Sequence, residues 1–147
     1  MIAVIGAGSC DDQLYRTAQH LGKLLAAAGF TVICGGLGGV MEAVCNGAKE
    51  ENGLTIGILP GEESAAANPF VDIVIPSGMG IGRNLLIIRA ADAVIAVNGG
   101  YGTLSEIAFA LQLGKPLIGL GSWKVSEQMI NVRSPEKALE SLTGLLG

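Results

Sequence analysis

Short apolar runs alternate along the chain with longer segments in which apolar residues recur at helical spacing. A short run without polar interruption is typical of a strand that is buried on both faces of a parallel sheet. The runs predict six strands, over residues 2–5, 31–34, 54–59, 71–75, 93–97 and 117–120. The segments between and after them predict helices over about 11–28, 40–51, 83–91, 103–113 and 135–145.

Residues at the predicted helix ends support this assignment. Asp11 or Asp12 suits the cap of the first helix, and Ser134 followed by Pro135 suits the start of the last one. Residues 62–69 have no apolar period, which indicates a surface loop, and the tail after residue 121 carries a weaker pattern. Because strands alternate with helices, we expect an α/β fold. It should form a single Rossmann-like domain over residues 1–147, a doubly wound and mostly parallel β-sheet with helices on both faces.

The composition fits this fold and indicates a second subunit. Half of the residues are apolar and only 15% are charged, which is typical of a compact α/β domain. The predicted helix over 103–113 is apolar almost all round, and residues 85–88 are similar. Such helices must be covered on both sides, and in a small domain a second subunit can do this. We therefore expect a homodimer or homotetramer; the alternative is that the tail of the chain covers these helices.

Charge and cysteine content exclude several classes of partner. The formal net charge is −4 and the nine basic residues are scattered, which argues against nucleic acid as a partner. Three cysteines without C-x-x-C spacing and a single histidine indicate reduced thiols and no metal site. Glycines interrupt the long uncharged segment 24–41, and no signal peptide is evident, so we expect a cytoplasmic protein with no membrane partner.

Two strand-to-helix joints share the pattern G-G-x-G-x-x-x-E, over residues 35–42 and 99–106. Glycine-rich segments at 6–9 and 78–82 also follow predicted strands, so four such segments are expected along one edge of the sheet. Glycines let the backbone approach an anion, and the following helix offers its positive end. The pattern predicts phosphate binding; the alternative is that the glycines only make tight turns.

The two common nucleotide motifs are missing from the chain. Asp11 stands where the third glycine of G-x-G-x-x-G belongs, no acidic residue follows the second strand, and no G-x-x-x-x-G-K-[ST] occurs. The expected ligand is therefore a small phosphorylated molecule held by loop amides, with no required cofactor. The candidate ligand-binding residues are Gly8, Ser9, Gly35, Gly36, Gly38, Gly39, Met79, Arg83, Asn98, Gly99, Gly100, Tyr101, Gly102 and Thr103.

Arg83 and Glu106 are the candidates for chemistry beyond phosphate binding. An arginine at the start of a helix lies against the helix dipole, which an anionic ligand offsets; the alternative is a solvated surface arginine. Glu106 ends a T-x-x-E sequence that begins at Thr103, which is typical of a capping box. The sequence leaves open whether Glu106 is a catalytic carboxylate or only a helix cap.

Residues 83–106, RNLLIIRAADAVIAVNGGYGTLSE, resemble the segment of the Lonely Guy family that runs from M-H-x-R-K to P-G-G-x-G-T-x-x-E. Residues 35–48, GGLGGVMEAVCNGA, are similar to the first glycine loop and helix of that family. Its members are phosphoribohydrolases, which cut the N-glycosidic bond of nucleoside 5′-monophosphates such as cytokinin precursors. The resemblance implies that Arg83 and Glu106 are catalytic and that residues 99–103 hold phosphate. Nothing in the sequence supports a lysine decarboxylase.

Four positions depart from the pattern of that family. Asn98 replaces a proline, Asn84 a lysine, Leu86 an acidic residue and Ile81 a histidine. In this respect the chain is more similar to the relatives that include the molybdenum cofactor carrier protein, which binds a pterin phosphate without transforming it. We therefore favour a binding protein for a nucleotide, a phosphate or a molybdopterin-type ligand. The alternative is a phosphoribohydrolase that uses Glu106 and Arg83.

Overall fold

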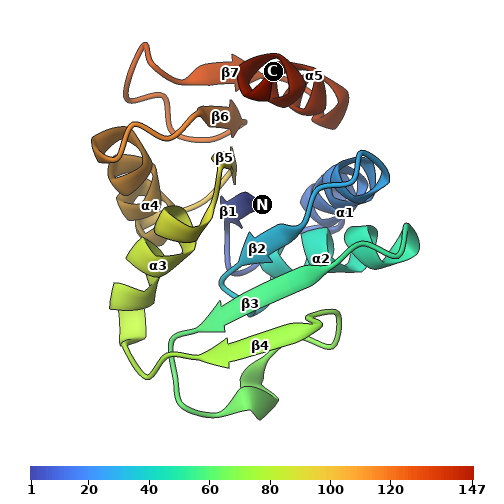
Figure 1. Ribbon diagram of the computed structural model, residues 1–147, viewed down its shortest axis with the longest axis vertical. Coiled ribbons are helices and arrows are strands. Elements are labelled where there is room, and N and C mark those ends of the chain that lie inside the picture. The colour runs from blue at the N-terminus through green and yellow to red at the C-terminus, as the bar shows by residue number, and fades with distance from the viewer.

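Seven parallel strands form one sheet in the computed structural model, which describes residues 1–147. The strand order is β4-β3-β2-β1-β5-β6-β7 (Figure 1). The strands are β1 (Ile2–Gly6), β2 (Val32–Cys34), β3 (Thr55–Leu59), β4 (Ile73–Pro76), β5 (Ala93–Val97), β6 (Leu117–Leu120) and β7 (Ile130–Val132). The helices are α1 (Asp12–Ala27), α2 (Val40–Glu50), α3 (Arg83–Ala90), α4 (Tyr101–Gln112) and α5 (Pro135–Leu146), with short 3₁₀ helices η1 (Ser64–Ala66) and η2 (Gly80–Gly82).

Helices cover both faces of the sheet. α1, α2 and α5 pack on one face, and α3 and α4 pack on the other (Figure 1). The side chains of the central strand β1 alternate between these layers, so that Ile2 and Val4 face α1 and α2, whereas Ala3 and Ile5 face α3 and α4. Because both faces are buried, the strands read as continuous apolar runs. The predicted doubly wound fold is confirmed.

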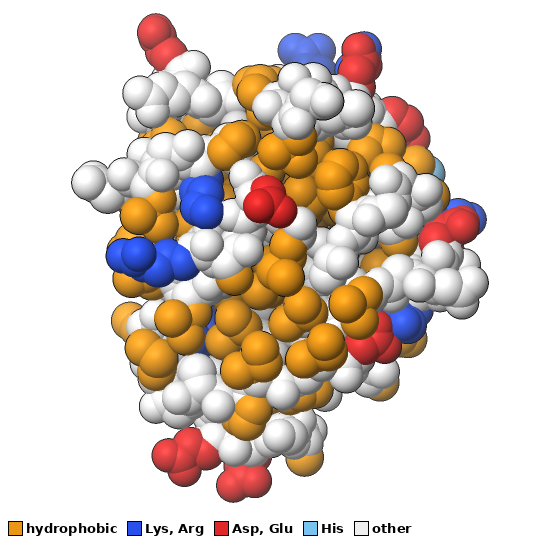
Figure 2. Space-filling view, in the orientation of Figure 1, with side chains coloured by type: hydrophobic (Ala, Val, Ile, Leu, Met, Phe, Trp, Pro, Cys, Tyr) orange, Lys and Arg blue, Asp and Glu red, His pale blue; other side chains and the backbone are white.

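One edge of the sheet is less well covered than the centre. Ile73 and Ile75 of β4 are exposed, as are Met79, Ile81 and Leu86 in the segment that follows. In the space-filling view, apolar side chains gather over the lower half, where β3 and β4 lie (Figure 2). We call these five residues the β4–α3 apolar surface.

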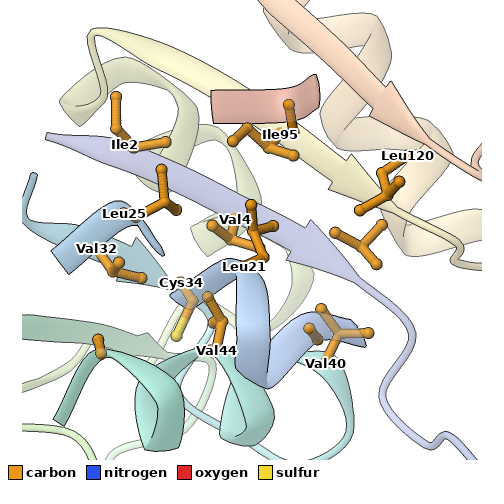
Figure 3. Close-up of a cluster of buried hydrophobic side chains, with 14 of the residues drawn as sticks. Ile2, Val4, Leu21, Leu25, Val32, Cys34, Val40, Val44, Ile95 and Leu120 are labelled. Carbon is orange, nitrogen blue, oxygen red and sulfur yellow. The ribbon is translucent and has the colours of Figure 1, made fainter. Parts of the chain in front are cut away.

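α1 and α2 approach each other closely because each carries a glycine where the helices meet. A Cβ atom on Gly22 would lie 2.0 Å from the Val44 carbonyl oxygen, and one on Gly47 would lie 1.7 Å from the Gln19 carbonyl oxygen. Both distances are far below van der Waals contact, so only glycine fits at either position. Figure 3 shows the side chains that these two helices direct towards β1: Leu21, Leu25, Val40 and Val44.

The structure confirms the six predicted strands and five predicted helices, with ends that differ by one or two residues. Asp11 and Ser134 cap α1 and α5 as expected, accepting hydrogen bonds from backbone N–H groups of the first turn. The sequence does not predict β7, because this exposed edge strand is only three residues long and its apolar run is broken by Asn131. None of the helices has the length and hydrophobicity needed to cross a membrane.

Candidate functional site

The carboxyl ends of β1 and β5 meet where the chain connections diverge to opposite faces of the sheet. Gly6 pairs with Val97, but β1 leads into α1 on one face and β5 leads into α4 on the other. Ligand crevices of doubly wound sheets lie at such a point. A cavity of about 260 Å³, which we call the switch-point cavity, lies there. It is lined by Val4, Ile5, Gly6, Ala7, Gly8, Gly35, Met41, Arg83, Asn84, Gly100, Gly102, Thr103 and Glu106.

The N-terminus of α4 directs free backbone N–H groups to this region. The helix begins at Tyr101 with Gly100 as its cap, and no side chain hydrogen-bonds to its first turn. The N–H groups of Tyr101, Gly102 and Thr103 have no hydrogen-bond partner within the chain, whereas Leu104 already donates to the Gly100 carbonyl. Free N–H groups and the positive end of the helix dipole together favour an anion.

Arg83 supplies a positive charge to the same cavity. It is the first residue of α3, and its Nε donates to the Ile58 carbonyl oxygen at 3.0 Å, which fixes the side chain against the end of β3. Its Nη1 group donates to the Asn84 side-chain oxygen. Burial lowers the pKa of Arg83, and the Glu106 carboxyl opposes this shift, but a guanidinium keeps its charge at neutral pH. Arg83 forms no ion pair within the chain, so its charge is available to a ligand.

Gly35 makes room for the Arg83 side chain. A Cβ atom on Gly35 would lie 2.8 Å from Nη2 of Arg83 and 2.7 Å from the sulfur of Met41. A larger residue directly after β2 would force the ends of the Arg83 and Met41 side chains to shift. The glycine therefore leaves the space in which the Arg83 guanidinium lies.

Glu106 lines the cavity, and its carboxyl group has a raised pKa. Its side chain is buried, and its carboxyl group has no hydrogen bond within the chain. Burial raises the pKa of Glu106 from its ordinary value of 4.5 to about 8, although the nearby Arg83 charge acts in the opposite direction. At neutral pH this carboxyl group is therefore mostly protonated, and it can donate a hydrogen bond or a proton to a ligand.

The capping interpretation of Glu106 is wrong. It required α4 to begin at Thr103, but the helix begins two residues earlier, and Gly100 is its cap. Glu106 therefore lies in the second turn, where it faces the cavity and bonds to no backbone N–H group. The hydroxyl of Ser105, not Glu106, reaches the start of the helix and donates to the Gly102 carbonyl oxygen at 2.6 Å.

The first glycine joint differs from the second although the two share a motif. At the start of α2 the Val40 N–H group donates to the Ala7 carbonyl oxygen at 2.9 Å. A Cβ atom on Gly39 would lie 2.3 Å from that same oxygen, and Gly39 has a φ of +64°. The loop after β1 therefore occupies the N-terminus of α2. Of the four glycines predicted here to bind phosphate, only Gly35 lines the cavity, because Gly36, Gly38 and Gly39 pack beside other backbone segments.

The remaining candidates divide between the cavity and its surroundings. Gly8, Gly100, Gly102 and Thr103 line it, whereas the other candidates do not: Ser9, Met79, Asn98, Gly99 and Tyr101. Met79 belongs to the turn before α3, and Tyr101 stacks on Trp123 with ring centroids 6.2 Å apart. Asn98 adopts a φ of +51°, and its side-chain oxygen accepts a hydrogen bond from the N–H group of Gly99. These five residues therefore lie outside the wall of the cavity.

The sequence interpretation missed some lining residues, of which Asn84 is the most informative. Asn84 is buried, accepts the bond from Arg83, and its Nδ2 lies 3.4 Å from the Ser105 hydroxyl. It therefore links the start of α3 to the start of α4. A signal existed, since Asn84 is the one polar residue between Arg83 and the apolar run at 85–88.

Comparison with known proteins places this architecture in a family. A family model described as the SLOG cluster4 family matches residues 1–143. The chain belongs to the SLOG cluster4 family. Among solved structures, this SLOG cluster4 chain is similar to the molybdenum cofactor binding protein of the phototrophic bacterium Rippkaea orientalis, with 36% identity and a TM-score of 0.94 over 99% of this chain and 96% of that one.

Two further relatives represent the alternatives that the sequence left open. The molybdenum cofactor carrier protein of Chlamydomonas reinhardtii is 30% identical with a TM-score of 0.89, over 99% of this chain and 97% of that one. A probable cytokinin riboside 5′-monophosphate phosphoribohydrolase of Oryza sativa subsp. japonica is 36% identical over 108 residues, which are 69% of this chain and 47% of that protein. The chain thus spans about half the length of the rice protein. The expected relationship to both groups is confirmed.

Proposed function

We propose that this protein binds a small phosphorylated ligand, a nucleotide or a pterin phosphate, in the switch-point cavity and carries it without transforming it. The observation that carries the proposal is the pairing of unbonded N–H groups at the start of α4 with the Arg83 guanidinium at the same cavity. A phosphate monoester can accept hydrogen bonds from the amides while the guanidinium balances its charge.

The size of the cavity indicates that only the phosphate end of the ligand lies inside it. A volume of about 260 Å³ accommodates a phosphate and the group bonded to it, and is below the range typical of sites that enclose a whole small molecule. The heterocycle would then lie at the mouth of the cavity, near the first turn of α4. Tyr101 is largely exposed there and offers a flat aromatic face.

Similarity to the two molybdenum cofactor proteins supports the carrier over the enzyme. Both align with nearly the whole chain, whereas the rice phosphoribohydrolase shares a shorter segment. The positions where the chain lacks the polar residues of Lonely Guy enzymes include Ile81, which is exposed, and Asn84, which bonds to Arg83. A cargo with a pterin phosphate would use Arg83 and the α4 amides for its phosphate, and its binding would require no proton transfer.

A phosphoribohydrolase is the second candidate, and Glu106 is the observation that favours it. A buried carboxyl group whose pKa is raised to about 8 can act as a general acid on a departing base, and once ionised it can stabilise a positively charged sugar. Hydrolysis would break the N-glycosidic bond, add water to the ribose carbon, and transfer a proton to the leaving nitrogen.

Calorimetric titration with AMP, together with an assay for released ribose 5-phosphate, tests the proposal. The carrier predicts AMP binding without release of ribose 5-phosphate, and at least about tenfold weaker binding in Arg83→Gln. Arg89→Gln is the matched control, because it removes the same charge from an exposed part of α3 that does not line the cavity.

Glu106→Gln distinguishes the two candidates. For a carrier this variant should retain AMP binding, since an amide can still donate a hydrogen bond. Release of ribose 5-phosphate by the parent protein that is abolished in Glu106→Gln would establish the hydrolase instead. Equal affinity of the parent and Arg83→Gln for AMP would contradict both candidates.

A further inference from the structure

A second and larger cavity, of about 520 Å³, lies at the carboxyl ends of β5, β6 and β7. It shares no lining residue with the switch-point cavity. The two are separated by the segment that leads from β5 to α4, because Asn98 lines one cavity and Gly100 lines the other. The volume falls within the range of sites that enclose a nucleotide-sized molecule. We call it the β7-side cavity.

The walls of the β7-side cavity are partly apolar. Val97 and Leu120, at the ends of β5 and β6, are buried in the core beside it, while Leu14 of α1 and Val132 of β7 are half-buried. These side chains come from both the sheet and the helix that covers it. A flat ring would remove apolar surface from water on entering such a cavity.

Two basic residues give the cavity its charge. Lys124 lies in the loop between β6 and β7, and Arg133 lies just after β7. Neither forms an ion pair within the chain, although the chain as a whole carries a net charge of −4. Both side chains are exposed, and two unpaired cations at one cavity give it a positive charge that can attract an anion.

We propose that the β7-side cavity is a second binding site, for a nucleotide-sized organic anion. The ring of the ligand contacts the apolar wall formed by Leu14, Leu120 and Val132, and its anionic group lies between Lys124 and Arg133. This site is independent of the proposed carrier function, because its residues belong to a different cavity. The protein then holds two anions at the carboxyl edge of one sheet, one on each side of the β5–α4 segment.

Backbone amide NMR shifts of the full chain can test this proposal with AMP and GMP as probes. We expect the amides of Gly119, Gly121 and Val132 to shift in a saturable manner with at least one of the two nucleotides. The double variant Lys124→Gln/Arg133→Gln should weaken this response about tenfold or more and leave the response at Gly102 unchanged. Arg89→Gln is the matched charge control, and its response at all four amides should equal that of the parent.

Two further measurements separate this proposal from the proposed function. Arg83→Gln should weaken the response at Gly102 but not the response at Gly119, Gly121 and Val132. Adenosine, which lacks the phosphate, should bind the β7-side cavity at least about tenfold more weakly than AMP. The proposal is overturned if neither nucleotide shifts the three amides, if the double variant responds like the parent, or if adenosine binds as tightly as AMP.

Discussion

Arg83 and Glu106 line the same cavity, yet they form no ion pair with each other. Burial disfavours the charged form of each side chain, and the attraction between the two groups offsets that penalty only in part. Part of the free-energy cost of burying these two groups therefore remains in the absence of a ligand. Such uncompensated groups are typical of sites that a ligand completes.

The raised pKa of Glu106 predicts that stability falls as the pH rises. The folded protein keeps a proton on Glu106 up to a pH of about 8, whereas the unfolded chain releases it near 4.5. The contribution of Glu106 to the stability of the folded state is therefore fully present below pH 4.5 and is lost as the pH rises to about 8. Glu106→Gln removes that loss, and we expect it to increase the unfolding free energy at pH 8 by about 1–3 kcal/mol relative to the parent.

Urea unfolding of both proteins at several pH values would measure this effect. The stability difference should shrink towards zero as the pH falls to 4.5. Glu63→Gln, on the exposed loop before η1, removes a carboxyl group that lines no cavity and is the matched control. A difference between parent and Glu106→Gln that does not change with pH would contradict the raised pKa.

At the level of single residues the sequence predicted some of the site and missed some. Arg83 was identifiable because a cation at a helix start opposes the dipole, and that argument needs no tertiary structure. The role of Glu106 was not decidable, because it depended on where α4 begins. Two glycines precede Tyr101 and allow the helix to begin there, so the T-x-x-E sequence lies inside the helix instead of at its end.

The two glycine joints also show what a sequence motif can and cannot predict, here at the level of helices and strands. Both join a strand to a helix at the carboxyl edge of the sheet, as predicted. Only the α4 joint has a free helix start, since the loop after β1 lies against the start of α2 through the Val40–Ala7 hydrogen bond. That contact is made between segments more than 30 residues apart in the chain, and a local motif cannot predict it.

This contact predicts unequal effects of alanine at two neighbouring glycines. Gly39→Ala introduces a Cβ that would lie 2.3 Å from the Ala7 carbonyl oxygen, at a φ of +64°, and should destabilise the protein by about 2–4 kcal/mol. Gly38→Ala is the matched control, because its nearest atom would lie at 3.5 Å. It should change the unfolding free energy by less than about 1 kcal/mol. Guanidinium unfolding would measure both, and similar losses in the two variants would contradict the contact.

At the level of the whole molecule, the sheet and its two helical layers were predictable, whereas the edge formed by β7 was not. Continuous apolar runs identify the strands that both layers bury, as in β1 and β5. β7 is short and exposed at one edge, so its sequence lacks that signal. The number of subunits depends on surface residues. The apolar pattern of the sequence does not show whether an apolar surface residue is covered by another subunit or exposed to solvent.

We expect the β4–α3 apolar surface to be the contact between subunits of a homodimer or homotetramer. Ile81 is 87% exposed and Leu86 is 37% exposed, and five apolar residues close together on a small protein favour association. Sedimentation analysis at micromolar concentration should give a mass of at least twice 14.9 kDa. Ile81→Asp/Leu86→Asp should weaken association about tenfold or more.

Leu145→Asp/Leu146→Asp is the matched control for that experiment. It places two acidic residues at exposed apolar positions on α5, away from the β4–α3 apolar surface. This variant should sediment like the parent. A parent protein that sediments as a monomer, or equal dissociation of the two double variants, would show that the surface does not join subunits.

The stack of Tyr101 on Trp123 gives the molecule a built-in optical reporter. Trp123 is the one tryptophan in the chain, and its Nε1 donates to the Gly100 carbonyl oxygen at 3.1 Å, next to the first turn of α4. A ligand that shifts the first turn of α4 changes the surroundings of this single indole. Its fluorescence emission can therefore report binding at that turn in real time and without a label.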